Sequence, residues 1–412
     1  MTSPITGYAE GYYGRLLEWP ERRQIVNTLQ RLELTTYYYA PKEDPCHRLQ
    51  WRMPYKQPWT EEFKLFCTYA HQRDVRVVTG VAPGLDFDFS DFPNSADFSS
   101  LVTKSQLLLD AGADLISLLM DDIDADFDER SGHFESEGQA HAALANALGD
   151  ALSTPQGVTD ENNRSDTCLW VTPRIYADEL IADAVDYLPA FVQTLKEHHH
   201  VLYCGSDVVA RVLNTESANA LRVVDTKMAA PVAKHRVIFW DNLYANDYCP
   251  RRLFIGPWRH RSPLQDVLLN PTGMVHTDCL LLELMAECLR YSSDGATEPG
   301  RTNSSWESVL LRHDVPQAFK HIAPFFYHPH FNNIEVTDNP VMKNIDSQEA
   351  LSALEHCLWQ WKTPLSREWY GYLFGLKHDL LTRIGRHPDQ RILKTQNQPL
   401  AHLLIANQKK DE

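Results

Sequence analysis

Short apolar segments recur along the chain and alternate with stretches of helical pattern. The apolar segments begin at intervals of about 30 to 40 residues. Between them, apolar residues fall three and four positions apart, for example in 20–32, 60–73, 99–111 and 138–151. Strands and helices that alternate eight times predict a (β/α)8 TIM barrel, whose chemistry sits at the carboxyl ends of the strands. The eight predicted strands are Ile5–Ala9, Thr35–Tyr39, Val75–Val81, Leu115–Met120, Cys168–Val171, Val201–Cys204, Arg236–Trp240 and Asp266–Leu269.

The remainder of the chain predicts a second, helical domain. A chain of 412 residues is long enough for a barrel and a smaller domain. The polar, Gly- and Pro-containing stretch 293–305 marks a natural boundary, and beyond it two apolar stripes at helical spacing indicate a small helical bundle. We therefore predict a catalytic barrel over residues 1–295 and a helical C-terminal domain over 306–412. A doubly wound open sheet is the alternative, but no Gly-x-Gly-x-x-Gly motif follows the first strand.

Two adjacent carboxylates, Asp121 and Asp122, follow the fourth predicted strand directly. Charges beside an apolar core lose hydration and repel each other, which is expected to raise the pKa of at least one and to divide the pair into an acid and an anion. Glycoside hydrolysis uses such a pair. A calcium loop over Asp122–Asp128 is the alternative, but Phe127 occupies the position where the sharp turn needs glycine. No metal site is predicted.

The composition of the chain disfavours some classes of binding partner. The formal net charge of −16 disfavours nucleic acid and anionic membrane surfaces. The N-terminus lacks a secretory pattern, and no segment approaches the length of apolar sequence that a membrane span requires. Eight cysteines without a Cys-x-x-Cys motif suggest neither a zinc site nor a disulfide framework. We predict a cytoplasmic protein with a neutral partner.

Polar and aromatic residues gather directly after the predicted strands. Gly11 lies in the segment after the first strand, Lys42 follows the second and Tyr176 the fifth. The seventh strand leads into Trp240-Asp-Asn-Leu-Tyr-Ala-Asn-Asp-Tyr248. An aromatic face beside amides and a carboxylate suits a pyranose ring, which stacks through its C–H face and donates hydrogen bonds from its hydroxyls. For Lys42, a salt bridge to a neighbouring acid is the simpler alternative.

Five motifs together carry a resemblance to a known family. The motifs are Gly7-Tyr-Ala-Glu-Gly-Tyr-Tyr-Gly14, Tyr39-Ala-Pro-Lys42, Met120-Asp-Asp-Ile-Asp124, Trp240 to Tyr248, and Leu269-Asn-Pro271. In this order they resemble the catalytic domain of glycoside hydrolase family 84, which contains the protein O-GlcNAcases and bacterial β-N-acetylglucosaminidases. The chain departs from the family in Thr172-Pro173-Arg174, where Cys-Pro-Thr is common.

The resemblance implies a role for each matching residue. Asp121 would polarise the 2-acetamido N–H of the substrate, so that the acetamido oxygen attacks the anomeric carbon. Asp122 would protonate the leaving oxygen and later deprotonate water as the oxazoline intermediate opens. Tyr176 would support the acetamido pocket and Trp240 would form its wall. The remaining sugar-binding residues would be Gly11, Lys42, Asn242, Asp247 and Asn270, and no cofactor is implied.

The resemblance leaves several functions open. The first is a retaining exo-β-N-acetylglucosaminidase that acts on protein O-GlcNAc or on GlcNAc-containing glycosides. The second is a hyaluronidase-type endo-β-N-acetylglucosaminidase, and the third is a catalytically silent carbohydrate-binding barrel. A homodimer through the helical C-terminal region is a further possibility that the resemblance implies.

Overall fold

The computed structural model describes residues 3–124, 127, 130–153, 167–214, 216–225, 230–249, 253–261, 264–293, 299–326 and 346–384. These residues form two compact units. The first contains the described residues of Met1–Pro250 and Pro257–Val309, and the second contains those of Arg251–Gly256 and Leu310–Glu412. The predicted domain limits, 1–295 and 306–412, stay predictions.

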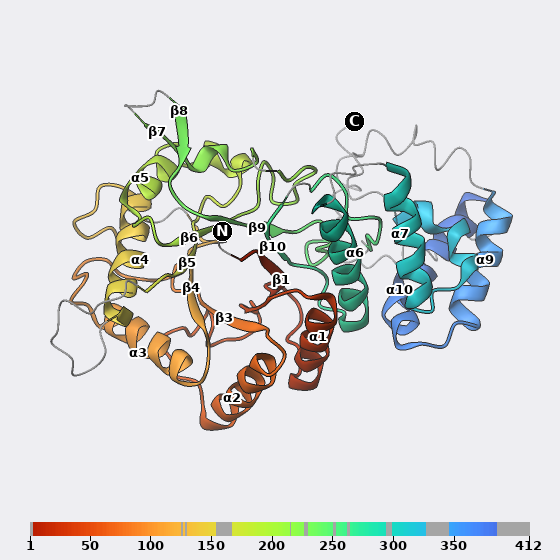
Figure 1. Cartoon of the computed structure of the whole chain (residues 1–412), viewed down its shortest axis with the longest axis horizontal. Coiled ribbons are helices and arrows are strands. Elements are labelled where there is room, and N and C mark those ends of the chain that lie inside the picture. The colour runs from red at the N-terminus through yellow and green to blue at the C-terminus, as the bar shows by residue number, and fades with distance from the viewer. Residues whose placement is uncertain are drawn as a thin grey trace, which may run out of the picture. The chain divides into compact units, whose positions relative to one another are not determined.

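The first unit is a closed barrel of eight parallel strands (Figure 1). Around the barrel the strands follow the order β1-β10-β9-β6-β5-β4-β3-β2. Each predicted strand coincides with one of them to within two residues, so the TIM-barrel prediction is confirmed. The barrel strands are β1 (Ile5–Glu10), β2 (Thr36–Tyr39), β3 (Arg76–Val81), β4 (Leu115–Leu119), β5 (Trp170–Thr172), β6 (His200–Tyr203), β9 (Val237–Asp241) and β10 (Asp266–Leu269).

Helices cover the outside of the barrel between successive strands. Two of them begin with capping residues: before α3, Ser95 accepts a hydrogen bond from the backbone N–H of Phe98, and at the start of α1, Glu18 and Glu21 form a capping box. The helices are α1 (Trp19–Leu32), α2 (Gln57–His71), α3 (Ala96–Asp110), α4 (Glu137–Ser153), α5 (Tyr187–Thr194) and α6 (Val275–Ser293). The four helices predicted by range correspond to α1 to α4.

Among the described residues, the eightfold alternation of strand and helix is incomplete. In the described residues after β6, a 3-10 turn, η4 (Asn219–Leu221), and an antiparallel hairpin of β7 (Arg222–Asp225) and β8 (Ala230–Ala233) take the place of an α-helix. The described residues between β9 and β10 contain no helix. Three prolines fall in that connection, at 250, 257 and 263, and proline lacks the N–H that a helix interior needs.

Large side chains fill the barrel interior. The ring of Tyr38 stacks on Trp170, with 6.0 Å between centroids, and meets the ring of Trp240 edge-on at 5.3 Å. The Tyr38 hydroxyl donates to Oγ of Ser117 at 2.8 Å, which satisfies its polar end inside the core. The interior is therefore a packed core, and ligand chemistry is left to the loops at the strand ends.

Apart from residues 253–256, the second unit is mainly helical in its described residues. It contains η5 (Gln317–His321), η6 (Ala323–Phe326), α9 (Ser347–Trp359) and α10 (Pro364–Arg383), while α7 (Pro299–Arg312) spans the division between the units. Trp361 and Trp369 pack edge-on at 5.4 Å, as expected of the apolar stripes. The end of the polar stretch 293–305 belongs to α7, which begins at Pro299, where proline is tolerated in the first turn. None of the described helices is both long and apolar enough to cross a membrane.

Candidate active site

The two adjacent carboxylates lie where β4 leaves the sheet. The backbone N–H of Met120 donates to the carbonyl of Thr172 at 2.9 Å, and the chain then turns away from β5 at Asp121 and Asp122. Asp122 has a φ of 53°, in the left-handed region that a non-glycine residue enters at a cost. The turn places both carboxyl groups at the carboxyl-terminal edge of the barrel, as the sequence predicts.

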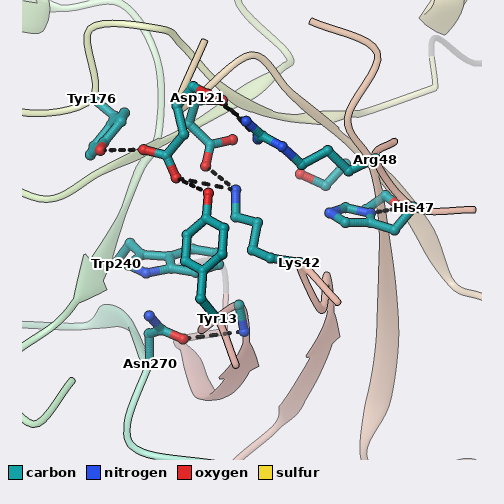
Figure 2. Close-up of polar contacts among 12 residues, drawn as sticks. Tyr13, Lys42, His47, Arg48, Asp121, Tyr176, Trp240 and Asn270 are labelled. Carbon is teal, nitrogen blue, oxygen red and sulfur yellow. Dashed lines mark hydrogen bonds and ion pairs between the residues drawn. The ribbon is translucent and has the colours of Figure 1, made fainter. Parts of the chain in front are cut away.

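Lys42 and Asp121 form the most buried ion pair of the site (Figure 2). The Lys42 ammonium donates to Oδ2 of Asp121, and its nitrogen lies 3.7 Å from Oδ2 of Asp122. The ion-pair alternative for Lys42 therefore holds in this structure. The other carboxylate oxygen, Oδ1 of Asp121, is buried and has no hydrogen-bond partner among the described residues. A buried acceptor of this kind is costly unless a ligand satisfies it.

Two tyrosines hold the carboxylate of Asp122. The hydroxyl of Tyr176 donates to Oδ1 at 2.7 Å and that of Tyr13 donates to Oδ2 at 2.8 Å. Burial raises the pKa of Asp122, but the Lys42 ammonium, the two tyrosine hydroxyls and the Arg48 guanidinium outweigh it, so that the pKa is lowered. The raised pKa expected for an acid of the pair is therefore wrong for Asp122 in this arrangement. The reason is that the donors around it stabilise the anion more than burial destabilises it.

The side of the site next to β1, β9 and β10 is formed by four residues, Gly11, Trp240, Asn242 and Asn270. The backbone N–H of Gly11 donates to Oδ1 of Asn270 at 3.2 Å, and a Cβ at Gly11 would lie 2.2 Å from the indole of Trp240. Trp240 Nε1 and Asn270 Nδ2 both donate to Oδ1 of Asn242 at 2.9 Å. The Asn242 amide nitrogen donates to the carbonyl of Val208 at 2.9 Å. The space beside Gly11 is thus filled by the indole, and the amide of Asn242 is occupied within the protein.

Asp247 is connected to the site by a hydrogen bond with Tyr13. Its Oδ2 accepts a hydrogen bond from the backbone N–H of Tyr13 at 2.9 Å, and its Oδ1 accepts from the N–H of Tyr248 at the same distance. The predicted site residues therefore gather around one end of the barrel. Asp121, Asp122, Lys42 and Tyr176 form one connected group, and Gly11, Trp240, Asn242 and Asn270 form another. Asp247 is joined to the first group by Tyr13.

The segment that departs from the family pattern anchors the loop of Tyr176. The guanidinium of Arg174 pairs with Oε2 of Glu137 at 2.8 Å, and its backbone N–H donates to the hydroxyl of Tyr187 at 2.9 Å. Both partners belong to the helices that flank β5. The backbone carbonyl of Tyr176 accepts from the N–H of Cys204 at 2.7 Å. Arg174 is therefore compatible with a position of Tyr176 beside Asp122.

Two residues of the site carry no role in the sequence-based prediction. Tyr13 falls within the first motif, and Arg48 lies six positions after Lys42 in the loop that follows β2. Arg48 donates to the carbonyls of both carboxylate-bearing residues, at 3.1 Å to Asp121 and more closely to Asp122. The signal for both was their place after a barrel strand. No cluster of three or more metal-ligating side chains occurs among the described residues, and Asp126 and Asp128 of the calcium-loop alternative lie outside them.

Known proteins match this chain in sequence and in fold. The family model described as beta-N-acetylglucosaminidase matches residues 6–306. The protein O-GlcNAcases of Rattus norvegicus and Mus musculus are each 28% identical over 315 residues, which is 74% of this chain and 32% of theirs. The chain thus spans about a third of the length of these relatives. A mutant O-GlcNAc hydrolase from Thermobaculum terrenum has the same fold, with a TM-score of 0.70 at 19% identity, over 95% of this chain and 88% of that one.

Proposed function

Because this chain belongs to the β-N-acetylglucosaminidase family, glycoside hydrolase family 84, we propose that it is a retaining exo-β-N-acetylglucosaminidase. Its substrate would be a terminal β-linked GlcNAc on a protein or a glycoside. The acetamido group of the substrate would act as the nucleophile and form an oxazoline intermediate. The family supports the hydrolase activity, and the arrangement around Asp121 and Asp122 supports the substrate-assisted mechanism.

Oδ1 of Asp121, which has no hydrogen-bond partner among the described residues, carries this proposal. Lys42 binds Oδ2 of the same carboxylate and so fixes the direction in which Oδ1 points. A buried carboxylate oxygen that lacks a donor is suited to accept one from a ligand, and the 2-acetamido N–H supplies such a donor. The hydrogen bond would increase the electron density on the acetamido oxygen, and the negative charge would stabilise the cationic oxazoline.

Asp122 is proposed as the acid and base of the reaction. In the first step the acetamido oxygen bonds to the anomeric carbon, the glycosidic bond breaks, and the leaving oxygen takes the proton of Asp122. In the second step the Asp122 carboxylate removes a proton from water, whose oxygen attacks the anomeric carbon and opens the oxazoline. For the first step Asp122 must be protonated, whereas the Lys42 ammonium and the bonds from Tyr176 and Tyr13 lower its pKa and so favour the anion.

The remaining residues are proposed to bind the sugar ring. Trp240 offers the wall of the acetamido pocket, and Tyr176 would support that pocket. Asp247 and Asn270 would bind hydroxyl groups. Asn242, whose amide is occupied by protein partners, would act on the sugar through Trp240 and Asn270. A cytoplasmic location and a homodimer stay predictions.

The function is tested by the release of p-nitrophenol from the β-N-acetylglucosaminide, with the matching β-glucoside as the control. We expect turnover of the first substrate alone, because the glucoside lacks the acetamido group. Asp121→Asn is expected to slow turnover, and nuclear magnetic resonance should show the β-anomer as the first product. Release of the α-anomer, or equal turnover of both substrates, would contradict the mechanism. Cleavage at internal GlcNAc residues of an oligosaccharide would contradict exo action.

A further inference from the structure

Arg48 binds the backbone of the two carboxylate-bearing residues, not their side chains. One terminal nitrogen of its guanidinium donates to the carbonyl of Asp121 at 3.1 Å, and the other donates to the carbonyl of Asp122 (Figure 2). Arg48 is buried, with an exposed fraction of 8%. Its planar fork is matched to two neighbouring acceptors, which the single ammonium of a lysine would satisfy less well.

The backbone at this point needs such a support. The ladder between β4 and β5 ends at Met120, so the carbonyls of Asp121 and Asp122 have left the sheet and need other donors. Asp122 is also in a left-handed conformation, with φ of 53°. A non-glycine residue in this region is strained and persists only where its surroundings hold it there. Arg48 supplies two hydrogen bonds directly across the turn.

The loop that carries Arg48 is itself firmly attached. The backbone N–H of Ala82 donates to the carbonyl of His47 at 3.0 Å, and Nδ1 of the His47 ring lies 2.9 Å from the carbonyl oxygen of Gly80. On the other side, the buried ammonium of Lys104 in α3 donates to three carbonyls of this loop, those of Cys46, Trp51 and Met53, at 2.5–2.8 Å. The loop that carries Arg48 is therefore held in place while the Arg48 side chain binds the turn.

We propose that Arg48 is a positioning residue that clamps the Asp121–Asp122 turn and thereby aims both carboxyl groups at the substrate without touching it. The expected effect of Arg48 on kcat rests on the proposed function. Its expected effect on the conformation of the turn does not. A misplacement of catalytic groups by about 1 Å costs about 10²-fold in rate. We expect a loss of this order in kcat when the clamp is removed.

The test compares Arg48→Met with Arg48→Lys and with the control Arg52→Met. Arg52 lies in the same loop but binds Asp86 and Asp97, and no bond joins it to the carboxylate pair among the described residues. Arg48→Met should lower kcat on the aryl β-N-acetylglucosaminide about 10²-fold, with KM changed less than about threefold. Arg48→Lys should recover part of kcat, because an ammonium can still serve one carbonyl. Arg52→Met should keep the wild-type kcat even if its melting temperature falls.

Three results would overturn the clamp. The first is an Arg48→Met protein with the wild-type kcat, and the second is an Arg48→Lys protein that folds but is no more active than Arg48→Met. The third is a loss of kcat in Arg52→Met equal to that in Arg48→Met. If the wild-type protein hydrolyses no β-N-acetylglucosaminide, the proposed function fails on its own. The clamp is then decided by a crystal structure of Arg48→Met, in which an unchanged turn at Asp122 would refute it.

Discussion

The hydroxyl of Tyr13 donates a 2.8 Å hydrogen bond to Oδ2 of Asp122, across 109 positions of sequence. Tyr13 is 45% exposed, so this bond lies at the open side of the site. It stabilises the anion of Asp122 and helps to lower the pKa of that carboxyl group. A residue at the open side of the site thus helps to stabilise the charged form of the proposed acid.

Replacement of this tyrosine should shift the pH profile of the enzyme. Tyr13→Phe removes one donor from the anion, so the pKa of Asp122 should rise. Activity that needs protonated Asp122 is lost as the pH rises through this pKa, and the descending limb of kcat/KM should therefore move to higher pH. Tyr69→Phe, which loses a bond to Asn27 on the barrel exterior, is the control. A descending limb at the same pH in both variants and the wild type would refute the role of Tyr13.

The proton donor itself can be identified by the leaving group. Asp122→Asn should damage the hydrolysis of substrates with poor leaving groups far more than that of aryl glycosides with good ones, because only the former need protonation. General acid catalysis contributes about 10²–10⁴-fold, and a difference of this order is expected between the two classes. Equal losses on both classes of substrate would remove Asp122 from the role of acid.

Asp247 provides a test of sugar binding that is independent of the chemical step. Asp247→Ala should weaken the binding of a GlcNAc-like inhibitor by about 1–3 kcal/mol, because hydroxyl groups lose a charged acceptor. The same change frees the backbone N–H of Tyr13, so Asp247→Asn, which keeps an acceptor oxygen, separates the two effects. Calorimetric titration of the inhibitor gives the affinities. Unchanged affinity in the Ala variant would place Asp247 outside the sugar site.

Buried neutral histidines predict that the protein loses stability in acid. Burial lowers the pKa of His47 and of His141 to about 3, whereas an unfolded histidine titrates near 6.5. Between these values the unfolded chain binds more protons than the folded one, so stability falls as the pH falls below about 6.5. Each such group contributes a slope of up to about 1.4 kcal/mol per pH unit.

Urea denaturation between pH 7 and pH 4 measures this slope. His141→Gln should make the dependence of the unfolding free energy on pH shallower, since one group that gains a proton on unfolding is removed. The matched control is His133→Gln, because His133 is exposed in the same region of the chain. If His141→Gln and His133→Gln have the same slope as the wild type, the buried histidine is not a source of the acid sensitivity.

The sequence predicted the barrel because the strands are encoded locally. A buried parallel strand is a short apolar run, and eight such runs were recognised within two residues of their observed limits. The hairpin of β7 and β8 and the lack of a helix in the described residues between β9 and β10 were not predicted. The sequences of those connections have no sustained apolar periodicity. Their secondary structure is therefore decided by contacts with the rest of the chain.

The sequence identified most residues of the candidate site but not the hydrogen bonds between them. Position after a strand identified Lys42 and the carboxylates, because parallel strands bring their carboxyl ends to one edge. The hydrogen bonds of Tyr13 and Arg48 connect loops that are distant in sequence, and no spacing rule encodes them. The same reason applies to the pKa of Asp122, which is lowered, whereas a raised pKa was expected for at least one of the two carboxyl groups. Burial can be inferred from an apolar run, whereas the donors that lower the pKa belong to other loops.

The nucleophile is the part of the mechanism that a substrate series tests most directly. If the acetamido oxygen attacks, fluorine atoms on the N-acetyl methyl withdraw electron density from it and must slow the reaction. Successive fluorination should then lower kcat/KM steeply, while the leaving group is unchanged. A thiazoline that mimics the intermediate should bind more tightly than GlcNAc, as ligands that resemble the transition state do.

The opposite result would assign the attack to the protein. A rate that is indifferent to fluorination, together with a glycosyl ester on an aspartate detected by mass spectrometry, would make Asp121 the direct nucleophile. The structure makes different demands on Asp121 in the two cases. As a nucleophile it would need an oxygen free to form a bond to carbon, and as a polarising group it needs one free to accept an N–H. The polarising role needs only a hydrogen bond to this oxygen. The buried Oδ1 lacks such a hydrogen bond among the described residues, so it is suited to that role.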